Sequence, residues 1–322
     1  MAISRGVLSL IGNTPMVRLN RIGRDLNAEV CVKLEYLNPS GSIKDRIALR
    51  MIEDAEKAGK LRPGMEILDA STGNTAASLA FVGAVKGYRV RIIVPKVAAS
   101  EERLRIMKAY GATVDLVEGA DPNDPQPEGG IHGDIAEKTP RQMCWEQEKA
   151  APGKIWWARQ FSSPGNDGAH CDGTGAEILA QTGGKVDAFV AAVGTGGTLV
   201  GVARALRAKN PAVKIIAVEP KESPVISNAK KNVMPNPELR GGLVPRIIDE
   251  KVADQVIPVS EPDAIAMAYR LAKEEGLYCG LSSGANVAAA LQIAREMNRG
   301  QRVVTILVDS RDRYLFKEKF TT

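Results

Sequence analysis

Short segments rich in β-branched and apolar residues alternate with longer helical patterns along the whole chain, and this alternation constrains the fold most strongly. The expected strands are residues 29–34, 66–70, 89–95, 113–117, 154–158, 187–193, 214–219 and 302–308. Several of them, such as DAFVAAV at 187–193, are nearly continuous apolar runs, as expected for parallel strands with helices on both faces. The pattern therefore predicts an α/β protein with doubly wound parallel sheets, whose ligands bind at the carboxyl ends of the strands.

Capping residues indicate where two of the helices begin and end. Ser260 is expected to cap a helix that ends before Gly276, and Ser100 to cap a helix that ends before Gly111. The segment GADPNDPQPEGGIHG at 119–133 has almost nothing to bury, so it is predicted to be a long surface loop.

Composition and charge exclude several functional classes. With 44% hydrophobic and 25% charged residues, the chain of 322 residues is typical of a globular protein with room for two domains. The net charge of +5 is spread along the chain without a basic block, so nucleic-acid binding is not expected. No apolar stretch is long enough for a membrane span and the N-terminus lacks a secretory signal, so the expected location is the cytoplasm.

The numbers of cysteines and histidines narrow the chemistry. The four cysteines lie far apart without a CxxC pair, which argues against a zinc site or a disulfide framework, and no metal is expected. The only histidines are His132 and His170. Proton transfer near neutral pH is therefore expected to depend on carboxylates, tyrosine or a lysine with an altered pKa.

Lys44 follows a turn-forming run, NPSGSIKDR at 38–46, and heads the apolar face of the next expected helix. That face contains Ala48, Met51 and Ala55, with Ile47 and Ile52 beside them. Asp45 is expected on the opposite, exposed face. Burial of the Lys44 ammonium would favour its neutral, nucleophilic form, which can form a Schiff base with an aldehyde. The periodicity alone is also compatible with a lysine that has no catalytic role and extends its ammonium group into solvent from the start of the helix.

Two turns rich in glycine and hydroxyl groups follow expected strands. ASTGNTAASLA at 70–80 places hydroxyls and backbone N–H groups at a helix start, which suits a carboxylate or phosphate, or forms an ordinary capping cluster. VGTGGTLVG at 193–201 has glycines that let the backbone fold around an oxyanion. Leu199 breaks the GxGxxG pattern and no Walker A sequence is present, so a smaller phosphate compound is favoured over NAD and nucleoside triphosphates.

A third motif, CGLSSGANVAAA at 279–290, places Ser282 and Ser283 just before another expected helix. A hydroxyl there can hydrogen-bond a ring nitrogen or cap the helix. Together these motifs point to pyridoxal phosphate. That cofactor supplies its own electron sink, so the protein need only bind its phosphate, attach its aldehyde through a neutral lysine and hold the carboxylate of an amino acid.

These motifs resemble the cysteine synthase family, the O-acetylserine sulfhydrylase and cystathionine β-synthase branch of fold-type II pyridoxal enzymes. The resemblance covers nearly the whole chain in order: IGNTPMVRL, NPSGSIKDR, STGNT, QFSSPGN, His170 with GTGAEI, VGTGGT, GLSSGA and DSRDRYL. It implies a tryptophan synthase β-like fold with two doubly wound parallel-sheet domains and the cofactor in the cleft between them. Residues 1–43 and 159–322 would form the larger, phosphate-binding domain, and 44–158 the smaller, mobile domain that binds the substrate carboxylate.

The resemblance also implies a role for each matching position. Lys44 matches the Schiff-base lysine, which also acts as acid and base. Asn74 matches the residue that hydrogen-bonds the cofactor's ring hydroxyl oxygen, and Ser282 matches the serine facing the pyridine nitrogen. The phosphate loop corresponds to Gly194, Thr195, Gly196, Gly197 and Thr198. The groups that hold the substrate carboxylate correspond to Ser71, Thr72, Gly73, Thr75 and Gln160.

The implied activity is β-replacement on an amino acid. Lys44 would take the α-proton, a β-leaving group would depart to give an aminoacrylate, and sulfide would add to it. The expected reaction is therefore cysteine biosynthesis from an activated L-serine, such as O-acetylserine, in a homodimer.

Some positions depart from the family pattern and leave alternatives open. These positions are Asp69, Ala70, Ser71, Thr72 and Ala76, while Lys230, Lys231 and Arg240 lie in a region that shapes leaving-group choice in relatives. The alternatives are O-phosphoserine as donor, homocysteine as nucleophile in a cystathionine β-synthase-like reaction, and a non-catalytic relative that binds a partner protein's tail.

Overall fold

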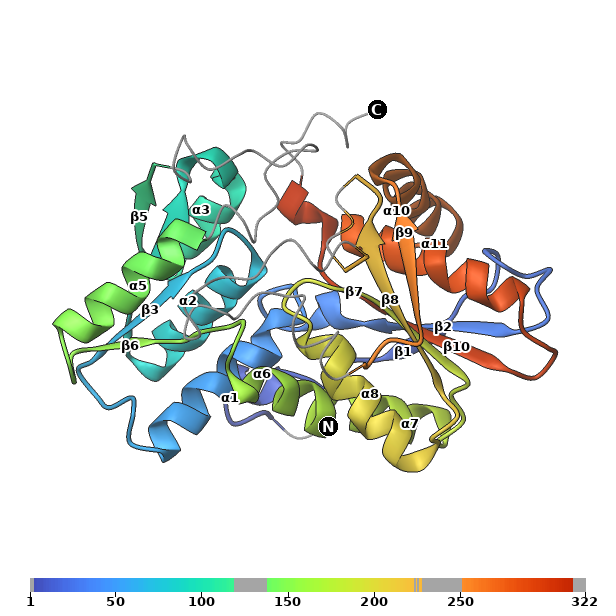
Figure 1. The fold of residues 1–322 in the computed structure, drawn as a ribbon, viewed down its shortest axis with the longest axis horizontal. Coiled ribbons are helices and arrows are strands. Elements are labelled where there is room, and N and C mark those ends of the chain that lie inside the picture. Colours follow the sequence, from blue (N-terminus) through green and yellow to red (C-terminus); the bar gives the residue numbers. More distant parts are fainter. Residues whose placement is uncertain (1–2, 119–137, 223, 225, 228–250, 315–322) are drawn as a thin grey trace. The chain divides into compact units, whose positions relative to one another are not determined.

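The computed structural model describes residues 3–118, 138–222, 224, 226–227 and 251–314 (Figure 1). The described residues divide into two compact units. The first is built on Lys44–Asn166 with residues 3–9, and the second on Leu10–Ile43, 167–222 and 251–314. The loop predicted at 119–133 and the basic residues Lys230, Lys231 and Arg240 lie outside the described residues.

The first unit has a four-stranded sheet in the order β5-β4-β3-β6, and all of its pairings are parallel. Its strands are β3 (Glu66–Ala70), β4 (Arg89–Pro95), β5 (Thr113–Val117) and β6 (Ile155–Trp157). Its helices are α1 (Lys44–Lys57), α2 (Asn74–Lys86), η3 (Lys96–Ala98), α3 (Glu101–Ala109) and α5 (Lys138–Ala150). Leu68 of β3 lies opposite both Arg91 and Trp157, so β3 is an interior strand. Burial on both faces explains its nearly continuous apolar sequence.

The second unit has a six-stranded sheet in the order β1-β2-β10-β7-β8-β9. Its strands are β1 (Met16–Arg18), β2 (Glu29–Leu34), β7 (Ala188–Ala192), β8 (Lys214–Pro220), β9 (Gln255–Val259) and β10 (Arg302–Leu307). Its helices are η2 (Glu35–Leu37), η4 (His170–Gly175), α7 (Ala176–Thr182), α8 (Gly197–Lys209), α10 (Glu261–Glu275), α11 (Leu281–Arg295) and η6 (Arg311–Tyr314). Two further helices, η1 (Val7–Leu10) and α6 (Pro164–Ala169), each include residues of both units.

The two edge strands of this sheet are absent from the sequence-based prediction. β1 pairs antiparallel with β2, so the expectation of a purely parallel sheet is wrong at this edge. β1 has only three residues, too few to show a periodicity. β9 contains Pro258, which lacks a backbone donor and is tolerated because β9 is an edge strand. The α/β class with mainly parallel sheets is confirmed.

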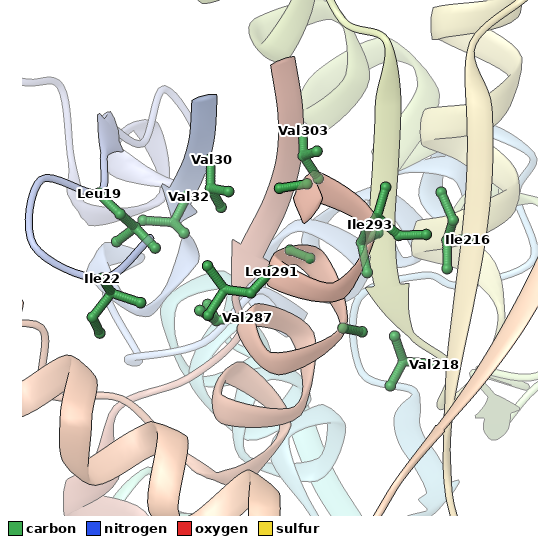
Figure 2. Packing of buried hydrophobic residues seen from close by; sticks show 14 of the residues in the cluster. Leu19, Ile22, Val30, Val32, Ile216, Val218, Val287, Leu291, Ile293 and Val303 are labelled. Carbon is green, nitrogen blue, oxygen red and sulfur yellow. The ribbon is translucent and has the colours of Figure 1, made fainter. Parts of the chain in front are cut away.

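The largest core of the second unit lies between its sheet and helix α11. Figure 2 shows Val287, Leu291 and Ile293 of α11 among side chains of neighbouring strands and loops. Val287 and Val32 are fully buried. Burial of such a side chain contributes about 1.5–3 kcal/mol relative to leaving it exposed, which fixes α11 against the sheet.

Helix termini agree only in part with the expected caps. Ser260 Oγ accepts a hydrogen bond from the Asp263 amide, and Gly276 follows α10 with a φ of 72°, as predicted. Ser100 precedes α3, but its hydroxyl bonds the Glu102 carboxylate and does not cap the helix, so that prediction is wrong. A nearby carboxylate has displaced the backbone amide as its partner.

Within the part of the chain that the structure describes, no helix is both long and apolar enough to cross a bilayer. The four cysteines all lie in that part and form no disulfide.

Candidate active site

Lys44 is the first residue of α1 and is half-buried. The predicted apolar face below it is confirmed, because Ala48, Met51 and Ala55 are all buried. The expectation that Asp45 is exposed is wrong: its carboxylate is buried and accepts a hydrogen bond of 2.7 Å from Ser78 Oγ on α2. Helix α2 supplies a polar partner that a periodicity within α1 cannot reveal.

The turn between β3 and α2 carries five of the predicted site residues. Gly73 is the N-cap residue of α2 and offers no side chain to cap it. Ser71 and Thr75 are buried, whereas Thr72 and Asn74 are half-buried. A helix start without a side-chain cap presents N–H groups and a partial positive charge, which suit an anion such as a carboxylate.

Arg103 of α3 adds a positive charge to this turn. Its Nη1 donates a hydrogen bond of 3.3 Å to the Thr72 carbonyl oxygen. A Cβ atom on Gly73 would lie 3.8 Å from the same Nη1. Arg103 is not among the predicted site residues, because its position on α3 carries no signal that it approaches a turn about thirty residues earlier.

Gln160 lies at the same end of the sheet as this turn. It is buried, and its Nε2 donates a hydrogen bond of 3.2 Å to the Ala70 carbonyl oxygen, directly before Ser71. Asn166 Nδ2 in turn donates to the Gln160 carbonyl oxygen at 2.8 Å. The first unit therefore brings Gln160 and the 71–75 turn together, although they are far apart in the sequence.

Asp69 is a buried carboxyl group beside the same turn. Its Oδ1 accepts a hydrogen bond of 2.9 Å from Trp157 Nε1, whereas Oδ2 has no hydrogen-bond partner among the described residues. Burial raises the pKa of Asp69 to about 7, and the Trp157 bond, the Ala70 amide and the Arg141 guanidinium oppose this rise only in part. The Asp69 carboxyl group therefore gains or loses its proton near neutral pH.

We expect Asp69 to make the stability of the protein fall as pH rises. Because its native pKa lies above the ordinary value of 3.8, the native state holds a proton between about pH 4 and pH 7 that the unfolded chain releases. Relative to Asp69→Asn, the wild-type free energy of unfolding should fall by about 2–3 kcal/mol between pH 5 and pH 8. Urea unfolding of both proteins across this range measures the difference. Parallel pH dependences of the two proteins would contradict the assignment.

In the second unit, the loop between β7 and α8 carries the predicted phosphate site. Gly196 has a φ of 82°, a left-handed conformation that favours glycine, and no side chain caps α8. A Cβ atom on Gly194 would meet no atom of the described residues within 4 Å, so these residues leave open space beside the loop. A glycine loop at an uncapped helix start, next to open space, fits a phosphate group.

His170 lies directly against this loop. The ring is fully buried in the π-helical segment η4. Its Nε2 is 3.1 Å from Thr198 Oγ1, and its Nδ1 is 3.0 Å from Thr174 Oγ1. His170 is predicted only as part of a family motif, without a role of its own. The spacing of four residues to Thr174 is the one local signal of this contact.

The serines of the GLSSGA motif lie inside α11 and not before it, because Gly280 is the N-cap residue. Ser283 is fully buried, and its Oγ accepts a hydrogen bond of 2.8 Å from the Val308 amide, so it anchors the chain after β10. Ser282 is half-buried.

Asn286 brings the start of α11 to the phosphate loop. Its Oδ1 accepts a hydrogen bond of 2.6 Å from the Ala192 amide at the end of β7, and its Nδ2 donates to the Ile306 carbonyl oxygen at 2.8 Å. Ser282, one turn earlier on α11, therefore lies at the same end of the sheet as the 194–198 loop. The second unit gathers the groups predicted for the phosphate and the ring nitrogen.

Comparisons with known proteins agree with this chemistry. The family model described as pyridoxal-phosphate dependent enzyme matches residues 7–309. A cysteine synthase of Staphylococcus aureus is 41% identical over 310 residues, which cover 96% of this chain and 94% of the relative.

Solved structures give the same result. The crystal structure of a cysteine synthase from Entamoeba histolytica aligns with a TM-score of 0.85 and 38% identity, covering 100% of this chain and 92% of that one. O-ureido-L-serine synthase aligns with a TM-score of 0.84 and 34% identity, covering 99% of this chain and 96% of that one.

Proposed function

The chain belongs to the family of pyridoxal-phosphate dependent enzymes, and we propose that it is a cysteine synthase that makes L-cysteine from O-acetylserine and sulfide. The observation that carries this proposal is the 41% identity to a cysteine synthase over 96% of the chain. The geometry supports it, because one uncapped helix start suits a substrate carboxylate and another suits the cofactor phosphate.

Pyridoxal phosphate, when bound, supplies the electron sink for chemistry at the α-carbon of an amino acid. In our proposal the N–H and hydroxyl groups of residues 194–198 hold its phosphate. Asn74 contacts the ring hydroxyl oxygen, and Ser282 faces the ring nitrogen. Because serine is neutral, it does not hold a proton on that nitrogen as a carboxylate would, which favours elimination over transamination.

Lys44 would attach the cofactor through Nζ and, once displaced by the substrate, move the α-proton. Its place at the head of the buried face of α1 supports this role, since the helix fixes the origin of a long, flexible side chain.

The substrate carboxylate would bind the turn at the start of α2. The proposed contacts are Ser71, Thr72, Gly73, Thr75 and Gln160. The positive charge of Arg103, hydrogen-bonded to this turn, would strengthen carboxylate binding. As part of the same proposal, the first unit is the mobile substrate-binding domain, predicted at residues 44–158, and the second unit is the phosphate-binding domain, predicted at 1–43 and 159–322. The enzyme is proposed to be a cytoplasmic homodimer.

Initial rates of cysteine formation with sulfide test the proposal. We expect kcat/KM to be highest for O-acetylserine and much lower for O-phosphoserine and serine, and homocysteine to replace sulfide poorly. Preference for O-phosphoserine, or formation of cystathionine from serine and homocysteine, would replace the proposed reaction with that alternative. Cofactor binding without turnover of any donor would favour a non-catalytic relative.

A further inference from the structure

His170 raises the question of which ring nitrogen carries its proton. Both ring nitrogens contact threonine hydroxyls, Nε2 with Thr198 and Nδ1 with Thr174. Each hydroxyl has one proton to donate and can also accept. A neutral imidazole carries its single proton on one of the two nitrogens, so two tautomers are possible.

The two tautomers have opposite consequences for Thr198. If the proton is on Nε2, the ring donates to Thr198 Oγ1, and the hydroxyl keeps its own proton for another acceptor. If the proton is on Nδ1, Nε2 must accept from Thr198, and the hydroxyl has no proton left. A phosphate offers only acceptors to its surroundings when it is a dianion, so it needs the first arrangement.

The local packing holds the ring at this distance. A Cβ atom on Gly201 would lie 2.7 Å from His170 Cβ and 2.4 Å from the Asp167 carbonyl oxygen, so glycine lets α8 approach the π-helical segment closely. Thr174 is also fully buried, and its Oγ1 lies within hydrogen-bond distance of Nδ1, where a hydroxyl can donate or accept. π-helical turns often occur at functional sites, where they reposition a side chain.

We propose that His170 is a positioning residue for the cofactor phosphate: as the Nε2–H tautomer it donates to Thr198 and thereby directs the threonine hydroxyl proton toward the phosphate. Thr174 selects this tautomer by donating to Nδ1. The inference rests on the proposed function only in taking the anion at the 194–198 loop to be the phosphate of pyridoxal phosphate.

Nitrogen-15 NMR of the histidine side chains tests the tautomer directly. The chain has only two histidines, so spectra of wild type and His132→Gln assign the His170 signals. We expect a proton on Nε2 and none on Nδ1, both with and without pyridoxal phosphate. A proton on Nδ1, or on both nitrogens, would overturn the proposal without any assay of substrate turnover.

Cofactor affinity tests the consequence for the phosphate. His170→Leu removes the donor and should weaken pyridoxal phosphate binding about tenfold, as expected for one hydrogen bond in a charged site. His170→Gln, whose amide can donate from a position near that of Nε2, should restore most of the affinity. In a Thr198→Val background, His170→Leu should have little further effect.

Equal losses for the leucine and glutamine variants, or a full additional loss in the Thr198→Val background, would show that His170 acts only by packing. Phosphorus-31 NMR of the bound cofactor adds a second readout, because its shift should change with His170→Leu and not with His132→Gln. These binding measurements do not involve the amino-acid substrate. If the amino-acid substrate is not O-acetylserine, the cofactor affinities and NMR shifts expected here would be unchanged. If the tautomer is wrong, the substrate preference measured by cysteine formation would be unchanged.

Discussion

Replacing Lys44 with alanine is expected to lower the turnover number by about 10³-fold or more and to abolish covalent attachment of pyridoxal phosphate. The expected loss is large because one amino group serves both as nucleophile and, in its two protonation states, as acid and base. The fold should persist, since the buried face of α1 is formed by apolar residues that follow Lys44 and the substitution leaves them in place. Cofactor bound without a covalent link should still be retained by the phosphate loop, at lower affinity.

Borohydride reduction followed by peptide mass spectrometry measures the attachment. The wild type should carry the cofactor mass on the peptide that contains Lys44, and Lys44→Ala should carry none. Lys57→Ala is the matched control, because Lys57 is exposed at the other end of the same helix. Cofactor mass on another lysine of the Lys44→Ala protein would show that Lys44 is not the attachment site.

The interior strands could be predicted from the sequence because burial on both faces leaves a direct signature. The interior strands β3 and β4 occupy the predicted residues, since a parallel strand between helical layers is apolar along most of its length. β1 and β9 could not be predicted on the same principle. One has three residues and the other contains Pro258, so neither shows a periodicity or a continuous apolar run.

The turns of the candidate site were also predictable, because glycine and hydroxyl residues gather where a strand gives way to a helix. The groups that support those turns were not. Arg103 reaches the Thr72 carbonyl from another helix, and His170 reaches Thr198 from a segment about thirty residues earlier. Such contacts depend on tertiary packing, and the periodicity of a single sequence does not reveal them. Asp45 shows the same limit, since its buried partner lies on α2.

Close packing of two helices also determines how precisely the second unit holds its part of the site. Gly284 of α11 faces the backbone of α10: a Cβ atom there would lie 2.0 Å from the Ala264 carbonyl oxygen and 2.9 Å from the Ala268 amide nitrogen. Backbone atoms cannot rotate away, so α11 would have to move. The move would shift Ser282 and Asn286, which α11 carries to the phosphate loop.

We therefore expect Gly284→Ala to lower the free energy of unfolding by about 2 kcal/mol or more, even though alanine is intrinsically the better helix former by about 1 kcal/mol. Thermal and urea unfolding should show this loss, and pyridoxal phosphate should bind more weakly as α11 shifts. Gln292→Ala is the matched control, because Gln292 is exposed on the same helix and its replacement should change stability by less than about 0.5 kcal/mol. If Gly284→Ala is as stable as the control, α10 and α11 cannot be in such close contact. If it is unstable but binds the cofactor normally, α11 does not determine the geometry of the phosphate loop.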